Sequence, residues 1–259
     1  MITEACQRWR ERVGSYRPAG EVFDAARHEV APIADDTTAR AFVEAHHYSG
    51  SYVAARRRFG LYERAELVGV AVYSVPVRAE VLRPFDASAA VELGRLVLLD
   101  RAKANAESWF VAECHRRLAR EGFEGVVSFS DPEPRARLDG RVVFAGHIGT
   151  VYQALNATYT GRAKPDTIYL LPDGRLFPRR ALVKVRKRER GWRYAVDTLV
   201  AAGAPTPGAD LDAWLAVALS TVLRRQRHGG NHRYTWALSR AGRRVLPASL
   251  PYPKLGGLA

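Results

Sequence analysis

Short runs rich in apolar and β-branched residues along residues 57–99 are typical of β-strands. Residues 57–63 and 66–77 predict two strands joined by a short polar turn, and residues 91–99 predict another. The segment 66–77 is apolar on both faces, which is typical of a strand in the middle of a sheet. The pattern therefore predicts a sheet whose centre lies in this part of the chain.

The period becomes helical after residue 105. Phe110, Cys114 and Leu118 recur every four residues, so they define the buried face of a helix over residues 106–121. Asn105 precedes this helix and is placed to cap its first turn.

The other predicted elements are shorter. They are an irregular or partly helical arm at 1–35, a helix at 37–45 capped by Asp36, a strand at 126–129, a helix from 150, a hairpin at 167–171 and 175–177, helices at 191–202 and 210–226, and a strand over HRYTWAL. This order predicts an α/β (α+β) fold with a mixed central sheet flanked by helices.

The composition changes at Lys184, where KVRKRERGWR places six basic residues around one acidic residue. We interpret residues 184–230 as a basic helical insertion, because the segment is short for a core of its own. The expected division is a catalytic core with an N-terminal arm over 1–183, this insertion, and a C-terminal strand and tail over 231–259 that pack on the core.

The net charge of the chain indicates what kind of partner it binds. Forty Lys and Arg against 27 Asp and Glu give the 259 residues a formal charge of +13, and such a surface gains affinity for nucleic acids by displacing counterions. Two cysteines are too few for a disulfide framework, and Cys114 is expected to be a reduced, buried thiol. Without a signal peptide or a membrane-spanning run, the expected location is the cytoplasm. The oligomeric state is not predicted.

Polar residues follow the predicted central strands. Ser128, Ser130 and Asp131 close one strand, and ligands of open sheets favour the crevice beyond strand ends. Arg95 lies within the neighbouring apolar strand, where its charge requires Glu92, Asp131 or a bound anion. Asp131 is thus a candidate general base or substrate orienter and Arg95 an anchor, although an ion pair that merely orders the sheet would leave the same pattern.

Two further clusters add candidates. Tyr152 and Asn156 lie four residues apart on the helix that begins near residue 150, so they are expected to share a face and to contact a base edge or a carbonyl; a pair that only caps this helix is the alternative. In the loop HHYSG, His47 is a candidate proton carrier beside Tyr48. His47, Asp131 and His147 are conceivable metal ligands, but no recognised spacing indicates a metal.

The loop at residues 100–105 bears on whether the chain could use acyl-CoA as the donor of a transferred group. In acyl-CoA enzymes of the predicted core, a glycine-rich loop at this position holds the pyrophosphate with backbone N–H groups. Here the loop contains Arg101 and Lys103 but no glycine. Acyl-CoA remains a possible donor by charge alone, and the donor is otherwise unknown.

Basic residues near aromatic ones can hold a phosphate backbone and stack on unpaired bases. We expect Trp192 and Tyr194 to belong to the core and the neighbouring cations to contact DNA. The candidate DNA contacts are Lys184, Arg186, Lys187, Arg188, Arg190, Arg224, Arg225 and Arg233.

The strand–helix–strand–helix order over residues 91–161 is similar to the core of the GNAT acyltransferase superfamily. More narrowly, the chain resembles the Mom-like DNA modification proteins of bacteriophages over residues 40–180 and 231–254. The motifs that carry the resemblance are HHYSG, ELGRLVL, NAESWFVAECHRRL, VVSFSDP, HIGTVYQALNATYTG and HRYTWAL followed by LPYPK.

The resemblance implies an enzyme that converts adenine in double-stranded DNA to N6-carbamoylmethyladenine and so protects phage DNA from restriction. Its location would be the host cytoplasm if a phage encodes the chain. The adenine would be flipped out of the duplex, and the donor would be a small molecule or a group carried on tRNA. By similarity, Asp131, Tyr152, His47, Ser130 and Arg95 are catalytic. The implied substrate-binding residues are Asn105, Ser108, His147, Asn156 and Tyr48.

Two other functions stay open. The first is a GNAT-like transferase that moves an acyl or aminoacyl group from acyl-CoA or aminoacyl-tRNA to a protein or small amine. The second is a nucleic-acid-binding protein without activity on a transferase scaffold. The strongly basic composition is compatible with each of them.

Overall fold

The computed structural model describes residues 5–10, 13–18 and 21–254 of the chain. The contacts divide it into two compact units, each with its own buried residues. The core unit consists of residues 1–132, 147–163 and 231–259, and the basic unit consists of residues 133–146 and 164–230.

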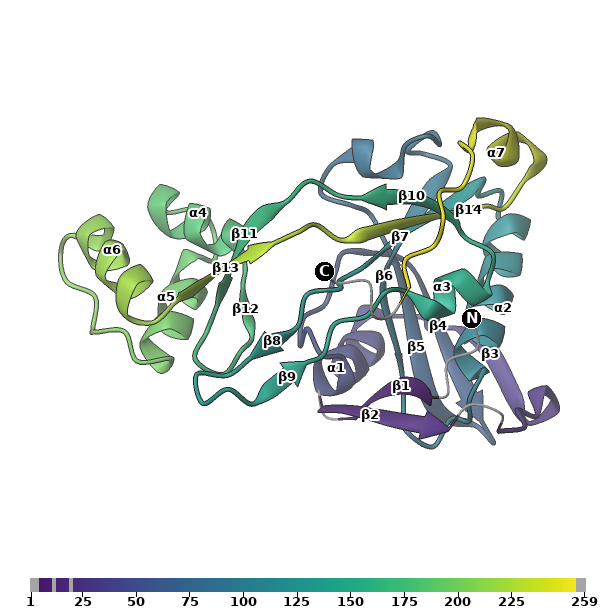
Figure 1. Cartoon of the computed structure of the whole chain (residues 1–259), viewed down its shortest axis with the longest axis horizontal. Helices are drawn as coiled ribbons and strands as arrows, with labels where there is room; N and C mark the ends of the chain where they lie inside the picture. The colour runs from purple at the N-terminus through teal and green to yellow at the C-terminus, as the bar shows by residue number, and fades with distance from the viewer. Residues whose placement is uncertain (1–4, 11–12, 19–20, 255–259) are drawn as a thin grey trace. The chain divides into compact units, whose positions relative to one another are not determined.

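A seven-stranded mixed sheet is the centre of the core unit (Figure 1). Adjacent strands are antiparallel except for the central pair β6 and β7, which is parallel. In spatial order the strands are β10 (Thr158–Arg162), β14 (His232–Ala237), β7 (Gly125–Ser130), β6 (Ala90–Leu98), β5 (Glu66–Ser74), β4 (Ala55–Glu63) and β3 (His28–Pro32). The expected α/β fold with a mixed central sheet flanked by helices is confirmed.

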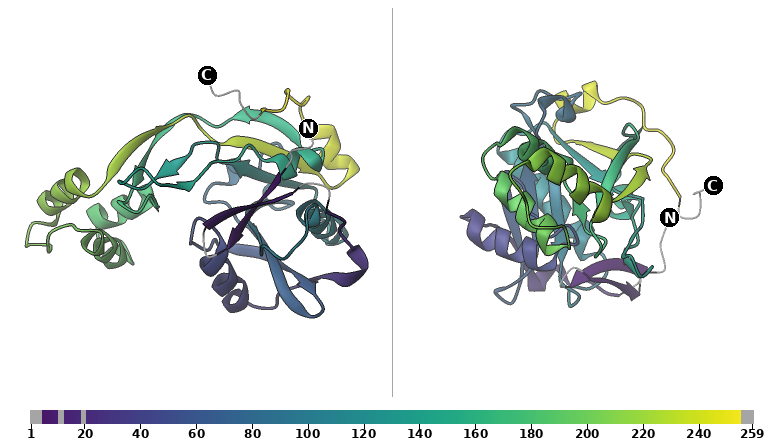
Figure 2. Two further views of the ribbon diagram at one scale, coloured as in Figure 1. Left: turned by 60° about the horizontal axis from the view of Figure 1, so that its bottom comes forward. Right: turned by 90° about the vertical axis from the view of Figure 1, so that its left-hand side faces the viewer.

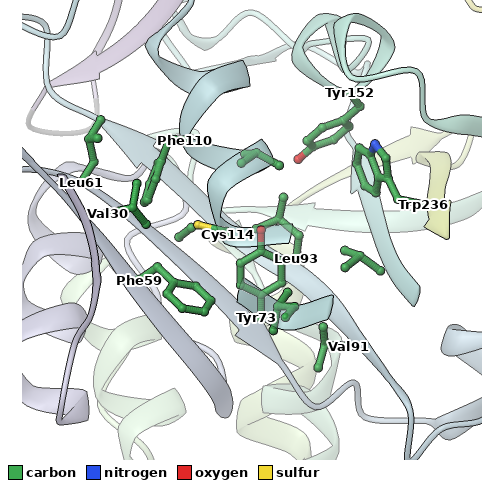
Figure 3. Packing of buried hydrophobic residues seen from close by; sticks show 14 of the residues in the cluster. Val30, Phe59, Leu61, Tyr73, Val91, Leu93, Phe110, Cys114, Tyr152 and Trp236 are labelled. Carbon is green, nitrogen blue, oxygen red and sulfur yellow. The ribbon is translucent and has the colours of Figure 1, made fainter. Parts of the chain in front are cut away.

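The helix α2 (Ala106–Arg120) buries its apolar side on one face of this sheet. Phe110 and Cys114 belong to the same core as Phe59 and Tyr73 from the sheet, and Figure 3 shows these side chains packed together. Because the Cys114 thiol is free and buried, burial raises its pKa, as expected for an unreactive core thiol.

The other face of the sheet has a smaller apolar cluster. Val127 belongs to it, whereas the preceding Val126 belongs to the larger core, since successive strand residues point to opposite faces. Leu82 and Phe85 cover Val127 from the segment that contains the short helix η2 (Ala79–Leu82).

Shorter helices complete the core unit. They are η1 (Ala25–Arg27), α1 (Asp36–His46), α3 (Thr150–Ala154) and α7 (Arg240–Val245). The expected cap of α1 at Asp36 is displaced by one residue, because the Asp35 carboxylate accepts the N–H groups of Thr37 and Thr38 at 2.7 and 3.1 Å.

The basic unit has a three-stranded sheet and three helices that share a second apolar core, with Leu199 and Leu215 among its buried residues. The helices pack against one another, as Figure 2 shows in green. The elements are β8 (Arg135–Ala136), β9 (Val142–Phe144), β11 (Asp166–Leu170), β12 (Leu176–Phe177), α4 (Arg179–Lys187), α5 (Trp192–Ala201), α6 (Leu211–Thr221) and β13 (Arg224–His228).

Two predicted elements were wrong in type. The described part of residues 1–35 forms mainly the strands β1 (Ala5–Arg10), β2 (Val13–Pro18) and β3, with η1 as its one short helix, rather than an irregular or partly helical arm. The helix predicted over 210–226 ends at Thr221, and Arg224–His228 instead pair with β11 as a strand. Both errors concern backbone pairing with distant segments, which local periodicity does not record.

Candidate functional site

The two parallel strands β6 and β7 separate at the centre of the sheet. They pair over only four residues, from Ala90 with Gly125 to Leu93 with Ser128. Beyond that point β6 continues beside β5, while β7 continues beside β14 to Ser130. The sheet therefore opens between the carboxyl ends of two parallel strands, which is where ligands bind in open α/β sheets.

A β-bulge lies at the start of this opening. Leu93 pairs with Tyr73 and Arg95 pairs with Val72, so Gly94 is the extra residue between them. A Cβ atom on Gly94 would lie 2.6 Å from the Ser74 hydroxyl oxygen, so only glycine fits without a shift. Bulges of this kind redirect the side chains that follow.

The first redirected side chain is that of Arg95. Its Nε donates to the Ser51 carbonyl at 2.9 Å and one terminal nitrogen donates to the Ser51 hydroxyl at 3.0 Å. Its other terminal nitrogen donates to the Gly94 carbonyl at 2.6 Å. Burial lowers the pKa of Arg95, while nearby Tyr48 and Glu92 oppose that shift. The guanidinium is thus fixed in orientation and has a carboxylate, Glu92, as its charge partner.

His47 lies at the end of α1 and is 5% exposed. Its Nδ1 accepts the Ser49 backbone N–H at 3.1 Å and lies 2.8 Å from the Ser49 hydroxyl. Burial, and then the charges of Arg95 and His147, hold the pKa of His47 well below 6.5. The ring is therefore neutral at pH 7, and because Nδ1 is an acceptor, its proton is on Nε2.

The ring of Tyr48 connects the two histidines. Its centroid is 4.2 Å from that of His47 and 6.3 Å from that of His147. The backbone N–H of His147 in turn donates to the Asp131 carbonyl at 2.7 Å. The end of β7 is thereby tied to the histidine pair.

Ser130 and Asp131 are both buried at the end of β7. Gly149 approaches this point closely, since a Cβ there would lie 3.2 Å from the Ser130 hydroxyl oxygen and 2.8 Å from the Tyr152 ring. Gly149 also has a φ of 73°, which favours glycine. The turn before α3 thus places Tyr152 beside the end of β7.

Tyr152 is buried against aromatic rings of β14. Its ring is in edge contact with Trp236 at 5.3 Å and with Tyr234 at 5.4 Å, and Figure 3 shows the first of these contacts. Burial raises the pKa of Tyr152, Ser128 lowers it by hydrogen bonding, and Glu92 raises it. The phenol is therefore protonated at pH 7 and able to donate a hydrogen bond.

The structure brings most of the sequence-predicted site residues together. Seven of them are linked by these contacts around the opening of the sheet: His47, Tyr48, Arg95, Ser130, Asp131, His147 and Tyr152. Whether they are catalytic or substrate-binding stays a prediction.

The remaining three residues, Asn105, Ser108 and Asn156, are not linked to the opening by these contacts. Asn156 is exposed and has a φ of 53° beyond the end of α3, so the expected shared face with Tyr152 was wrong. The helix stops after Ala154, and no further turn exists to align the two residues. Asn105 precedes α2 with a φ of 70° and makes no side-chain cap, while the Ser108 hydroxyl donates to the Asn105 carbonyl at 3.0 Å.

Three residues of the site were not among the sequence-based candidates. Ser51 holds Arg95, Gly94 forms the bulge, and Tyr234 packs on Tyr152. A glycine inside an apolar strand is a known sign of a bulge, so Gly94 had a usable signal. Ser51 had none, since a serine in a polar loop is ordinary.

Three N–H groups of the loop before α2 are bonded within the protein. The Ala104 N–H donates to the Glu21 carboxylate at 3.0 Å, and the Ala102 and Ala106 N–H groups donate to backbone carbonyls at 3.0 and 3.2 Å. A carboxylate therefore lies beside this loop, and these three N–H groups are already used.

The basic unit contains most of the expected DNA contacts. It has sixteen Lys or Arg residues against eight Asp or Glu residues, a formal charge of +8. Lys184 on α4 is partly buried, whereas the following cations and those of β13 are exposed: Arg186, Lys187, Arg188, Arg190, Arg224 and Arg225. Arg233 belongs to the core unit, and its guanidinium donates to Thr160, Val81 and Arg83.

The expected burial of two aromatic residues of α5 is confirmed for only one of them. Trp192 packs partly against the apolar core of the basic unit, with two arginine side chains over its ring. Tyr194 is 76% exposed, so its assignment to the core was wrong. It lies next to Ala195 and Val196, which point inward, and the helix turns Tyr194 away from them.

Within the part of the chain that the structure describes, no group of three or more His, Cys, Asp or Glu could hold a metal ion. Among the same residues, no helix is both long enough and apolar enough to cross a membrane.

These features define an α/β protein with a buried polar site where two parallel strands of a mixed sheet separate. The chain belongs to the Mom protein family, whose sequence profile matches residues 27–254. The resemblance stated from the motifs is thereby confirmed. No curated protein sequence matches the chain.

Three solved structures are similar to parts of the chain. A tandem GNAT protein from the clavulanic acid biosynthesis pathway is 9% identical, with a TM-score of 0.45 over 82% of this chain and 99% of that one. An N-acetyltransferase from Staphylococcus aureus Mu50 is 10% identical, with a TM-score of 0.31 over 71% and 68%. An acetyltransferase from Bacillus subtilis in complex with CoA is 8% identical, with a TM-score of 0.34 over 82% and 99%.

Proposed function

We propose that the protein modifies adenine in double-stranded DNA, converting it to N6-carbamoylmethyladenine and so protecting phage DNA from restriction. Membership of the Mom family is the observation that carries the proposal. The buried polar site and the charge of +13 support it, because the reaction requires a water-poor pocket and a polyanionic substrate.

The chemistry requires removal of a proton from a weak nucleophile. The exocyclic amine of adenine has its lone pair delocalised into the ring, so a base must accept its proton as the new C–N bond forms. Asp131 is the base in this proposal, and the bond between the donor carbon and its leaving group breaks with its electron pair on the leaving group. Tyr152 then protonates the leaving group, a role that rests on its place beside the end of β7 and on its being protonated at pH 7.

Arg95 and His47 would act on charge that develops in the donor. The Arg95 guanidinium is held by Ser51, so it is preorganised rather than flexible. His47 presents a neutral Nε2–H at pH 7, which makes it a hydrogen-bond donor to a carbonyl oxygen instead of a second base. Ser130 and Tyr48 complete the proposed pocket, with His147 as a substrate contact.

Adenine must leave the base stack before it can enter a buried site. We therefore include a flipped adenine in the proposal, with the exposed cations of α4 and β13 holding the phosphate backbone. Asn105, Ser108 and Asn156 stay as candidate substrate contacts on the strength of the motifs alone. The donor is left unassigned, because the Glu21 carboxylate already accepts the Ala104 N–H of the loop before α2.

The deciding experiment measures modified nucleosides. The full chain is expressed in bacteria, plasmid DNA is recovered and digested, and its nucleosides are analysed by mass spectrometry. We expect a modified adenosine whose added mass corresponds to a carbamoylmethyl group. Asp131→Asn should abolish it, whereas Asp197→Asn, at an exposed position of α5, should leave it unchanged.

A plasmid that contains only unmodified adenine would contradict the proposal. Acyl or aminoacyl transfer from acyl-CoA or aminoacyl-tRNA to a protein or small amine is the second candidate, favoured by the same basic surface. Turnover of labelled aminoacyl-tRNA by the purified chain, together with unmodified plasmid, would establish that alternative.

A further inference from the structure

The hairpin formed by β8 and β9 ends in a tight turn with a fixed conformation. The Gly140 N–H donates to the Arg137 carbonyl at 3.1 Å, and the Arg137 N–H donates to the Arg141 carbonyl at 2.9 Å. Gly140 has a φ of 84°, and the Asp139 carboxylate accepts the Arg141 N–H at 3.0 Å. The turn is thus determined by its own hydrogen bonds.

The tip of this hairpin exposes apolar side chains. Leu138 is 69% exposed within the turn, and Val142 is 59% exposed just after it. Turn positions usually hold Gly, Pro, Asn, Asp or Ser, so a leucine here is not explained by the turn. A single exposed leucine is ordinary on a protein surface; a leucine at a turn with an arginine close on each side, Arg137 and Arg141, is more specific.

The hairpin is attached to the rest of the basic unit. The Leu138 N–H donates to the Pro172 carbonyl at 3.0 Å, and the Arg224 guanidinium donates to the Ala136 carbonyl at 2.6 Å. The Gln226 amide donates to the Pro134 carbonyl at 3.1 Å. These bonds fix the backbone of the tip, so little conformational entropy remains to be lost when Leu138 contacts another molecule.

In the sequence, the hairpin lies between two residues of the proposed catalytic site, Asp131 and His147. The His147 N–H donates to the Asp131 carbonyl at 2.7 Å. Leu138 is the seventh residue after Asp131 in the sequence, so the tip is tethered by the chain to the end of β7. A segment tethered in this way can contact the DNA whose adenine occupies the site.

We propose that Leu138 is a wedge that enters the base stack of double-stranded DNA and fills the place of the extruded adenine. This inference rests on the proposed function. Apolar side chains, leucine among them, are used by DNA-bending proteins to part neighbouring bases, and an enzyme that acts on an extruded base must compensate the lost stacking. Leu138 is apolar, exposed and rigidly presented, as such a wedge must be.

Charges at the tip fit a phosphate backbone on both sides of the wedge. Arg137 and Arg141 flank Leu138, and each is exposed. The one carboxylate at the tip, that of Asp139, is 3.6 Å from the Arg137 Nε and accepts the Arg141 N–H. Arg137 and the Arg141 N–H therefore offset the negative charge of Asp139 within the hairpin, which reduces its repulsion of DNA phosphates.

The test measures unstacking of thymine and does not need the donor. An adenine that leaves the duplex exposes the opposite thymine, which permanganate oxidises when it is unstacked. Purified wild-type protein, Leu138→Ala and Leu138→Phe are each bound to unmodified plasmid DNA and treated with permanganate. The matched control is Val217→Ala, which shortens an aliphatic side chain that is 47% exposed on α6 of the same unit.

We expect the wild-type protein and Val217→Ala to make thymines reactive, and Leu138→Ala to reduce that reactivity about fivefold or more. Leu138→Phe should retain it, because a phenyl ring also fills the gap. Affinity for DNA, measured by fluorescence anisotropy, should change less than about threefold, since the phosphate contacts remain. Thermal unfolding of Leu138→Ala should match the wild type, because the side chain is exposed.

The outcomes separate this inference from the proposed function. If the wild type modifies adenine in cells but Leu138→Ala unstacks thymine as well as the wild type does, the wedge is wrong and the function stands. If the plasmid from cells stays unmodified while thymine reactivity still depends on Leu138, the function is wrong and the wedge stands. DNA binding by the wild type without any reactive thymine would overturn the wedge.

Discussion

Arg95 illustrates how far a single residue can be understood from sequence. An arginine within an apolar strand predicts a partner, and Glu92, Asp131 or an anion were the expected ones. The structure places Glu92 close enough to influence the pKa of Arg95, but the hydrogen bonds go to Ser51 and to the Gly94 carbonyl. The need for a partner was predictable, whereas its identity depended on a loop 44 residues away in sequence.

The geometry at Arg95 gives a direct prediction. Lysine keeps the charge but has one nitrogen, so it cannot reproduce the planar set of three nitrogens that bond Ser51 and the Gly94 carbonyl. Arg95→Lys should therefore reduce modified adenine in plasmid DNA about a hundredfold, with thermal unfolding close to that of the wild type. Arg57→Lys, at an exposed position, is the control that should retain full modification. Equal modification by Arg95→Lys and the wild type would rule out a role that depends on the planar arrangement of the Arg95 guanidinium N–H donors.

His115 gives a prediction about acid stability. Its ring is fully buried between Tyr73 and Trp236, and burial lowers its pKa from 6.5 to about 3. The unfolded chain binds a proton here between pH 6.5 and 3 and the folded chain does not. His115 therefore does not lower the free energy of unfolding above pH 6.5. Between pH 6.5 and about 3 that free energy decreases as the pH falls, by about 1.4 kcal/mol for each pH unit.

His115→Phe should remove this part of the pH dependence. Urea unfolding followed by circular dichroism at several pH values gives the free energy of unfolding for both proteins. The difference between them should grow in favour of the variant from pH 6.5 to 4.5 and stay constant above pH 7. A difference that does not change with pH below 6.5 would show that His115 is protonated in the folded protein.

At the scale of elements, the order of strands and helices was predictable, and the opening of the sheet was not. Apolar periods located β4, β5, β6 and α2 because each element has an apolar face of its own. The separation of β6 from β7 and the pairing of Arg224–His228 with β11 depend on contacts between distant segments. The sequence RRQRH in particular has no alternation that would indicate a strand.

The bulge in β6 is an element-scale feature that can be tested. A methyl group on Gly94 would lie 2.6 Å from the Ser74 hydroxyl oxygen and 3.2 Å from a Val53 methyl carbon. Gly94→Ala should reduce the free energy of unfolding by about 1–3 kcal/mol through overpacking. Adding Ser74→Ala removes the closest contact, so the double variant should lose less than the sum of the single losses, measured by urea unfolding. Simple additivity would show that the clash is relieved by backbone movement.

At the scale of the whole molecule, charge was the most informative property of the sequence. The expected boundary at residue 184 stays a prediction, while residues 133–146 pack with 164–230 through bonds such as those from Arg224 and Gln226. Composition cannot reveal that association, because it joins segments about 90 residues apart. It did reveal the excess of cations, and the basic unit holds +8 of the total of +13.

That distribution predicts which cations determine the salt dependence of DNA binding. Each phosphate contact contributes about 0.9 to the slope of log affinity against log salt concentration. Replacing Arg186, Lys187 and Arg190 by alanine should therefore reduce the magnitude of the slope by about two to three, with a similar effect on all DNA sequences. The matched triple variant replaces three exposed arginines of the core unit by alanine: Arg64, Arg120 and Arg244.

Both triple variants lower the net charge from +13 to +10, so a general effect of charge would alter the two slopes equally. Fluorescence anisotropy titrations between 50 and 200 mM salt, roughly the range over which phosphate contacts are best resolved, measure both. If only the first variant has a smaller slope, the cations in the last turn of α4 and just after it contact phosphate directly. Equal slopes would mean that the DNA responds to the total charge of the protein, and the basic unit would then have no special part in binding.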